Sequence, residues 1–376
     1  MKQGHIYGTT TPISPAEGNS PNSYAHTPEC VKLMKDAGIQ MCRTFFTFPF
    51  TDATLSETTE EYKKTLECVR LYQANGIKTM AGFSTAEISS VDSEGLVSFV
   101  RQYPEWMGGY DGDYYYEVLE KFAGRVAADL GDTVTYWQIG NENDMVAFKG
   151  TLTHEQNVRY LNALARGVKK VNPNAICGIN LAGMYSPSEH QEGELALHSV
   201  HPYAVELINA LYHGENAWFD YIGLDGYFGS WADGEPQNWE DYINQAYETA
   251  GKPVMINEWG YSTLQRGKPR PVEDQNRRFN TDVCRYKDWD KNGTRKWQGK
   301  DHSEEMQAEY ITECLKIFRD NPHCIGNLFF QWQDMATCWQ CGDDDCPSET
   351  AWGCIDKNGR PKPGYHALQK FIQENA

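Results

Sequence analysis

Two glutamates stand in the same local context, each directly after an asparagine and near the end of a strand-like run. Glu142 follows Asn141 in VTYWQIGNENDM, where residues 134–139 are typical of a buried strand. Glu258 follows Asn257 in PVMINEWGYST, again after a short apolar run. Either glutamate alone is typical of a solvent-exposed turn. Two carboxylates brought together, however, divide the work of a hydrolysis, because one donates a proton while the other attacks as a nucleophile.

A repeated unit of helix, glycine and strand would have to position this pair. In TPECVKLMKDAGIQMCR, Thr27 is the expected helix N-cap and Gly38 the expected stop, and a short apolar strand follows. The unit recurs with Gly76 and with Gly251 as the stop. Strands are expected at residues 6–8, 39–43, 77–83, 134–139, 175–179, 221–225, 254–257 and 328–332. This α/β alternation predicts one (β/α)8 TIM barrel, a single catalytic domain over residues 1–376.

The barrel gives the two glutamates a common place. Residues just past the C-terminal ends of the strands point into the active site of such a fold, so Glu142 and Glu258 would meet at the barrel mouth. The connections 84–112 and 264–300 are long, and so is the one after the last strand. We therefore expect extended loops after strands 3, 7 and 8 on the catalytic face. A carboxylate pair at this position is what glycoside hydrolysis requires.

With GNEN and INEWG at these strand ends, the sequence resembles the clan A retaining glycoside hydrolases, the superfamily of TIM-barrel β-glycosidases. The resemblance covers the whole chain as an ordered set of strand-end residues. It implies that Glu142 is the acid/base, that Glu258 is the nucleophile, and that Asn141 hydrogen-bonds the sugar 2-hydroxyl. The implied reaction is cleavage of β-glycosidic bonds in oligo- or polysaccharides by a double displacement, which needs no cofactor.

The same resemblance implies three further substrate-binding residues, and we expect a fourth, Asp225, to bind substrate at a position where the pattern differs. Arg43 in MCRTFF matches the clan's arginine beside the nucleophile, and Tyr227 in LDGYFGSW matches its strand-six tyrosine. Trp332 in FFQWQD matches its strand-eight tryptophan. Asp225 departs from the pattern, because several member families have histidine or asparagine there. This departure concerns the identity of the substrate more than the mechanism.

A cluster of cysteines in the loop after the last strand raises a separate question. TCWQCGDDDCPSETAWGC holds Cys338, Cys341, Cys346 and Cys354, a spacing that can close a tetrahedral zinc site. We expect a structural zinc here, with disulfides or free thiols as the alternatives. Four thiolates would leave no open coordination position for catalysis.

Two other classes of function compete with the hydrolase. The first is a carbohydrate-binding barrel without turnover, which the intact glutamate pair disfavours. The second is a zinc-dependent barrel enzyme that uses the cysteine cluster, and a chelator would then abolish its activity.

The composition of the chain limits the classes of partner that it can be expected to bind. The formal net charge of −18 disfavours nucleic acid and anionic membranes, and 13% of the residues are aromatic, which suits the stacking of sugar rings. No apolar run is long enough to span a membrane. The N-terminal residues lack the apolar core of a signal peptide, so a cytoplasmic protein is expected, or a secreted one whose signal was removed. The expected partner is a carbohydrate substrate.

Overall fold

The strands close into a barrel in which neighbouring strands are all parallel. The computed structural model describes residues 4–375 apart from 12–26, 84–86, 92–96, 101–102, 184–197, 215–216, 231, 233, 265–296, 338–343, 345 and 347–348. The barrel order is β1-β10-β9-β8-β7-β6-β3-β2. Its strands are β1 (Ile6–Thr10), β2 (Met41–Phe46), β3 (Lys78–Phe83), β6 (Tyr136–Gln138), β7 (Ile176–Leu181), β8 (Tyr221–Gly226), β9 (Val254–Trp259) and β10 (Cys324–Phe329). The predicted (β/α)8 barrel is confirmed.

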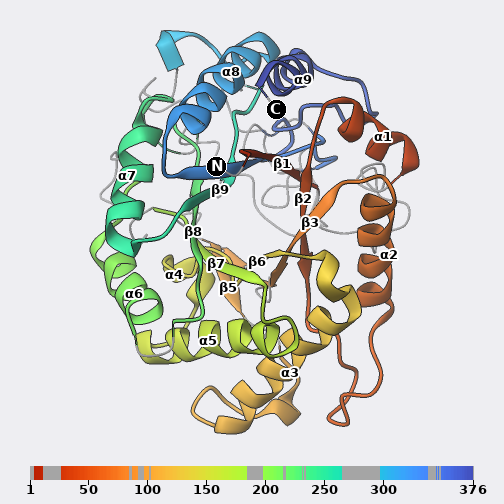
Figure 1. Ribbon diagram of the computed structural model, residues 1–376, viewed down its shortest axis with the longest axis vertical. Helices are drawn as coiled ribbons and strands as arrows, with labels where there is room; N and C mark the ends of the chain where they lie inside the picture. Colours follow the sequence, from red (N-terminus) through yellow and green to blue (C-terminus); the bar gives the residue numbers. More distant parts are fainter. Residues whose placement is uncertain are drawn as a thin grey trace.

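Helices surround the strands as an outer ring (Figure 1). The ring contains α1 (Pro28–Asp36), α2 (Glu60–Ala74), α3 (Asp113–Leu130), α5 (His154–Val171), α6 (Pro202–Tyr212), α7 (Asn238–Ala250), α8 (Glu304–Asp320) and α9 (Pro363–Asn375). The short helix α4 (Val146–Lys149) follows β6, and 3₁₀ turns lie at Glu105–Met107, Gly131–Thr133 and Trp297–Gly299. Helices in the described part of the chain are all too short or too polar to cross a bilayer.

The helix ends follow the local chemistry of the sequence. The Thr27 side chain caps α1 by accepting from the Cys30 amide at 3.3 Å. Gly38, Gly76 and Gly251 all have positive φ (85°, 79° and 63°), a conformation that glycine adopts without a Cβ penalty. The predicted helix stops are therefore confirmed.

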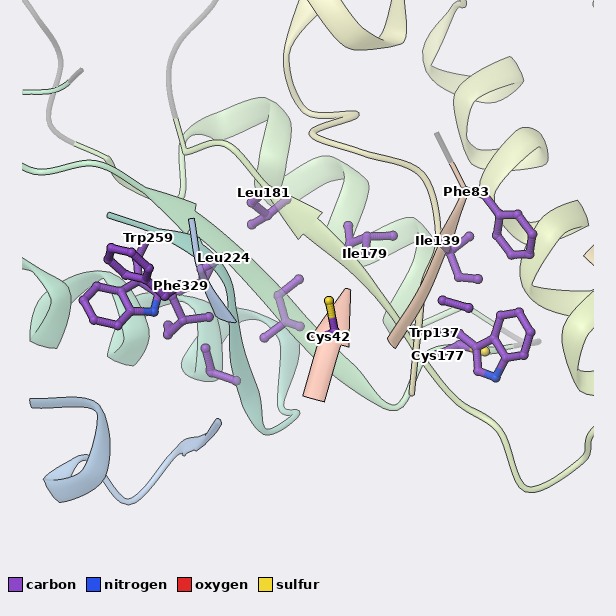
Figure 2. Packing of buried hydrophobic residues seen from close by; sticks show 14 of the residues in the cluster. Cys42, Phe83, Trp137, Ile139, Cys177, Ile179, Leu181, Leu224, Trp259 and Phe329 are labelled. Carbon is purple, nitrogen blue, oxygen red and sulfur yellow. The ribbon is translucent and has the colours of Figure 1, made fainter. Parts of the chain in front are cut away.

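Alternate strand residues separate into two apolar layers. Outward side chains pack under the helices, and Figure 2 shows part of this layer, in which the rings of Phe83 and Trp137 stack 5.9 Å apart. Inward side chains form a second cluster that closes the barrel interior: Met41, Met80, Tyr136, Tyr221, Met255 and Leu328. This cluster fills the barrel interior, and the inward polar residues at the C-terminal strand ends lie next to it.

The loops depart from the sequence expectation in part. The long connection after β3 contains an antiparallel hairpin, β4 (Glu87–Val91) with β5 (Val97–Val100). Most of the expected 264–300 loop lies outside the described residues. The last strand is also displaced: it was expected at 328–332 but spans Cys324–Phe329, because its ladder with β1 and β9 begins at the start of this segment.

Candidate active site

Glu142 lies on a tight turn immediately after β6. Gly140 has φ 76° and Glu142 itself has φ 45°, which is uncommon for a residue with a side chain. A Cβ on Gly140 would stand 2.3 Å from Asn143 Oδ1 and 2.7 Å from a Leu161 methyl group, so no other residue fits there without movement. The Glu142 amide donates to Asn180 Oδ1 at 3.1 Å. The turn therefore fixes the direction in which this half-buried glutamate leaves the strand.

The direction of the Glu258 side chain depends on an irregularity in β9. Along the ladder with β8, Leu224 pairs with Ile256 but the next pair is Asp225 with Glu258, so β9 carries one extra residue, Asn257. The pairing of β9 with β10 shifts at the same place. In a regular strand Asn257 and Glu258 would face opposite sides of the sheet. The bulge lets both side chains turn into the barrel.

Two side chains hold the Glu258 carboxylate. One oxygen accepts from the Arg43 guanidinium and the other from the Tyr227 hydroxyl, and both contacts are short. Arg43 and Tyr227 are almost fully buried, at 3% and 2% exposure, while Glu258 is 9% exposed. Burial, together with the negative charges of Glu258 and Asp225, holds the pKa of Tyr227 well above its usual range, so the hydroxyl stays a donor. The two predicted residues lie beside the predicted nucleophile.

A layer of amides joins the two glutamates. Gln138 Oε1 accepts from Arg43 at 2.9 Å and from Asn257 Nδ2 at 2.7 Å, while its Nε2 donates to Asn141 Oδ1 at 3.0 Å. Asn180 Nδ2 donates to the same Asn141 oxygen at 3.1 Å. With Oδ1 occupied twice, Asn141 presents its Nδ2 group as a hydrogen-bond donor. Such a donor suits a sugar hydroxyl.

Asp225 is a third carboxyl group near the two glutamates. It is fully buried, and Oδ2 accepts from Asn180 Nδ2, while Oδ1 has no hydrogen bond among the described residues. Burial first, and then the charges of Glu258 and Glu142, raise the pKa of Asp225 well above its usual range. Asp225 pairs with Glu258 in the β8–β9 ladder, and Asn180 contacts both Asp225 and the Glu142 amide, so both glutamates lie near Asp225. The Asp225 side chain, at 0% exposure, has no accessible surface to offer to a sugar in this structure.

The prediction that Trp332 contacts substrate does not hold in this structure. Its side chain is fully buried, its indole N–H donates to Cys30 Sγ at 3.0 Å, and its ring packs on Tyr365 at 5.8 Å. The reason is the position of β10, which ends at Phe329 instead of at residue 332. Phe330 is the half-buried aromatic residue after this strand, with its ring 5.8 Å from that of Tyr227.

The cysteine cluster is described only in part. Cys338 and Cys341 lie outside the described residues, whereas Cys346 and Cys354 are both buried. Burial raises the pKa of the Cys354 thiol, and this cysteine forms no disulfide with another described cysteine. Within the described ranges, three or more His, Cys, Asp or Glu side chains do not gather as a metal site. The structural zinc stays a prediction.

Comparison with protein families agrees with this geometry. The model of "Glycosyl hydrolase family 53" matches residues 15–297. The chain belongs to glycosyl hydrolase family 53. It is therefore a glycoside hydrolase, and the resemblance to the clan A TIM-barrel glycosidases is confirmed. No curated protein sequence matches the chain.

Solved structures share the fold at low sequence identity. The family 53 catalytic domain of Ignisphaera aggregans is 16% identical, with a TM-score of 0.63 over 98% of this chain and 96% of that one. The family 1 β-glucosidase of Thermotoga maritima is 13% identical, with a TM-score of 0.61 over 100% and 99%. A β-glucuronidase of Bacteroides uniformis is 14% identical, with a TM-score of 0.58 over 99% of this chain and 35% of that one.

Several site residues escaped the sequence reasoning. Gln138, Asn180 and Asn257 form the amide layer, and each sits two residues after another inward position of its strand, such as Tyr136 or Met255. The period of two would therefore have identified them, once the inward face was known. His198 lies outside any strand, and no local pattern marks it.

Proposed function

We propose that this family 53 enzyme hydrolyses β-glycosidic bonds of oligo- or polysaccharides with retention of configuration, through a two-glutamate double displacement. The observation that supports this most strongly is the environment of Glu258. Arg43 and Tyr227 hold its carboxylate oxygens, and the Glu142 amide is tied through Asn180 to Asp225, which pairs with Glu258 in the β8–β9 ladder. A fixed, ion-paired carboxylate suits a nucleophile, because its lone pairs are already oriented for attack.

The proposed reaction uses two steps at one sugar carbon. Glu142 protonates the leaving oxygen while Glu258 attacks the anomeric carbon, which gives a covalent glycosyl-enzyme. Glu142, now a carboxylate, then takes a proton from water, and that water displaces Glu258 with a second inversion. The Asn141 amide group, whose oxygen already accepts from Gln138 and Asn180, would donate to the 2-hydroxyl. The chemistry of these residues requires no cofactor.

The family indicates which substrate to test first. Family 53 is the endo-β-1,4-galactanase family, so β-1,4-galactan is the first polysaccharide to test. A screen of aryl β-glycosides and plant polysaccharides, with the products resolved by size, would identify the sugar and the mode of cleavage. Chelator should not change the initial rate of the folded enzyme, because a zinc held by four cysteine thiolates has no open position for catalysis.

The two glutamates are separable by kinetics. Glu258→Ala should abolish turnover of every substrate, since no glycosyl-enzyme forms. Glu142→Ala should lose about 10²–10⁴-fold on substrates with poor leaving groups. With an acidic phenol as leaving group it should still form the intermediate and then stall for want of a base. Added azide, which needs no base, should release a β-glycosyl azide.

Glu248→Ala is the matched control, because Glu248 is exposed on α7. It should keep the wild-type rate. An α-configured first product from a β-glycoside would exclude the retaining mechanism. Full activity in Glu142→Ala or Glu258→Ala would remove that residue from the site.

A further inference from the structure

His198 connects the ends of two strands through both nitrogens of its ring. Nδ1 lies 2.6 Å from the Ala182 carbonyl oxygen, just past β7, and Nε2 accepts from the Tyr227 amide at 2.9 Å, just past β8. A backbone amide can only donate, so Nε2 carries no proton and Nδ1 must be the donor to Ala182. These two contacts fix one neutral tautomer, and burial lowers the pKa of His198 to about 4.

Aromatic residues hold the imidazole ring in this orientation. His198 is 5% exposed, and its ring stacks on Tyr242 of α7 at 6.1 Å with an angle of 21°. Phe228 meets the imidazole edge-to-face at 5.2 Å. The Tyr242 hydroxyl donates to the Leu181 carbonyl at 3.2 Å, so α7 fixes both the imidazole and the end of β7. The ring therefore acts as a rigid spacer between β7 and β8.

The backbone that His198 contacts is also tied to the loop of Glu142. Asp144, two residues after Glu142, accepts from the Ala182 amide at 2.9 Å and from the Gly183 amide at 3.1 Å. Its carboxylate is buried and also lies 3.1 Å from His201 Nε2. A continuous line of contacts thus runs from the acid/base loop to Ala182, on to His198, and from there to Tyr227.

We propose that His198 is a positioning residue for the nucleophile: by accepting from the Tyr227 amide, it sets the direction in which the Tyr227 hydroxyl donates to Glu258. This inference rests on the proposed function, in which Glu258 is the nucleophile. His198 touches neither glutamate in the described contacts, so it acts through Tyr227. Misplacement of a group at the reacting centre by about 1 Å costs about 100-fold in rate.

The test compares His198→Phe with His198→Gln. Phenylalanine keeps the aromatic packing but makes neither hydrogen bond, whereas the glutamine amide offers one acceptor and one donor. On the aryl β-glycoside that the wild-type enzyme cleaves best, kcat should fall about 10- to 100-fold in His198→Phe with a smaller change in KM. His198→Gln should recover most of that loss. Inactivation by the matching 2-deoxy-2-fluoro-glycosyl fluoride, which reports on nucleophilic attack alone, should slow in parallel.

The double mutant of His198→Phe and Tyr227→Phe tests whether the loss of kcat in His198→Phe depends on Tyr227. If His198 acts through the Tyr227 hydroxyl, then His198→Phe should cost less than about 3-fold in a Tyr227→Phe background. Multiplicative losses would overturn the proposal, and so would a wild-type inactivation rate in His198→Phe. If His198→Phe fails to fold, the same cycle with His198→Gln gives the answer, because its residual defect must vanish in the Tyr227→Phe background.

His213→Phe is the matched control, because His213 is exposed at the end of α6 and its imidazole Nε2 lies 2.8 Å from the Thr249 carbonyl oxygen, away from the two glutamates. It should leave the kinetics unchanged. The proposed function and the inference about His198 can be refuted independently. Turnover by Glu258→Ala would end the proposed function, whereas an inactive Glu258→Ala together with a normal His198→Phe would end only the inference about His198.

Discussion

The buried carboxyl of Asp225 should make the enzyme less stable as the pH rises, and Asp225→Asn should remove that loss. Burial and the charges of Glu258 and Glu142 raise the pKa of Asp225 well above its usual range. Above about pH 4 the unfolded chain releases this proton while the folded protein retains it. The folded state then binds more protons than the unfolded state, so stability falls with rising pH. Asparagine has nearly the same shape and does not titrate.

The size of the change in the free energy of unfolding follows from the release of one proton. For each pH unit over which only the unfolded chain releases this proton, the folded state loses about 1.4 kcal/mol of stability, and pH 5 to pH 7 is the range to test. Full burial of the side chain means that solvent does not screen this effect. The free energy of unfolding of Asp225→Asn, relative to wild type, should therefore increase steadily over that range.

Urea unfolding at pH 5, 6 and 7 measures this difference directly. Asp132→Asn is the control, because Asp132 is exposed in the 3₁₀ turn before β6, and its difference from wild type should not change with pH. A gap between Asp225→Asn and wild type that stays constant from pH 5 to pH 7 would refute the reasoning. It would mean that Asp225 is ionised in the folded enzyme, paired with Arg43.

Three further changes test the site. Gly140→Ala should reduce kcat by about 100-fold while the protein still folds, because a Cβ 2.3 Å from Asn143 Oδ1 would displace the turn that carries Glu142, the proposed acid/base. Unchanged kcat would contradict this. Phe330→Ala should raise KM, whereas Trp332→Phe should mainly lower the melting temperature, and a larger KM change in the Trp332 variant would reverse that assignment. Metal analysis of the purified protein should find about one zinc per chain, bound by the four clustered cysteines. Zero metal with two disulfides would end the zinc prediction.

The helix caps, the helix stops and the succession of strands along the chain are local properties. The sequence by itself determines them. Thr27, Gly38 and Gly251 act through their own backbone geometry and that of their neighbours, so they could be predicted without knowledge of the fold. Repetition of that unit predicts a parallel barrel, and the barrel brings distant strand ends together. The two glutamates were identified in this way.

The direction of individual side chains at the strand ends required the tertiary structure. Regular alternation from Met255 would turn Glu258 outward, and only the bulge at Asn257, visible through pairing with both neighbouring strands, turns it into the barrel. Trp332 was misassigned for a related reason, because the end of β10 is set by its partners and not by its own apolar residues. A strand's register is a relation between distant segments, and local sequence does not contain it.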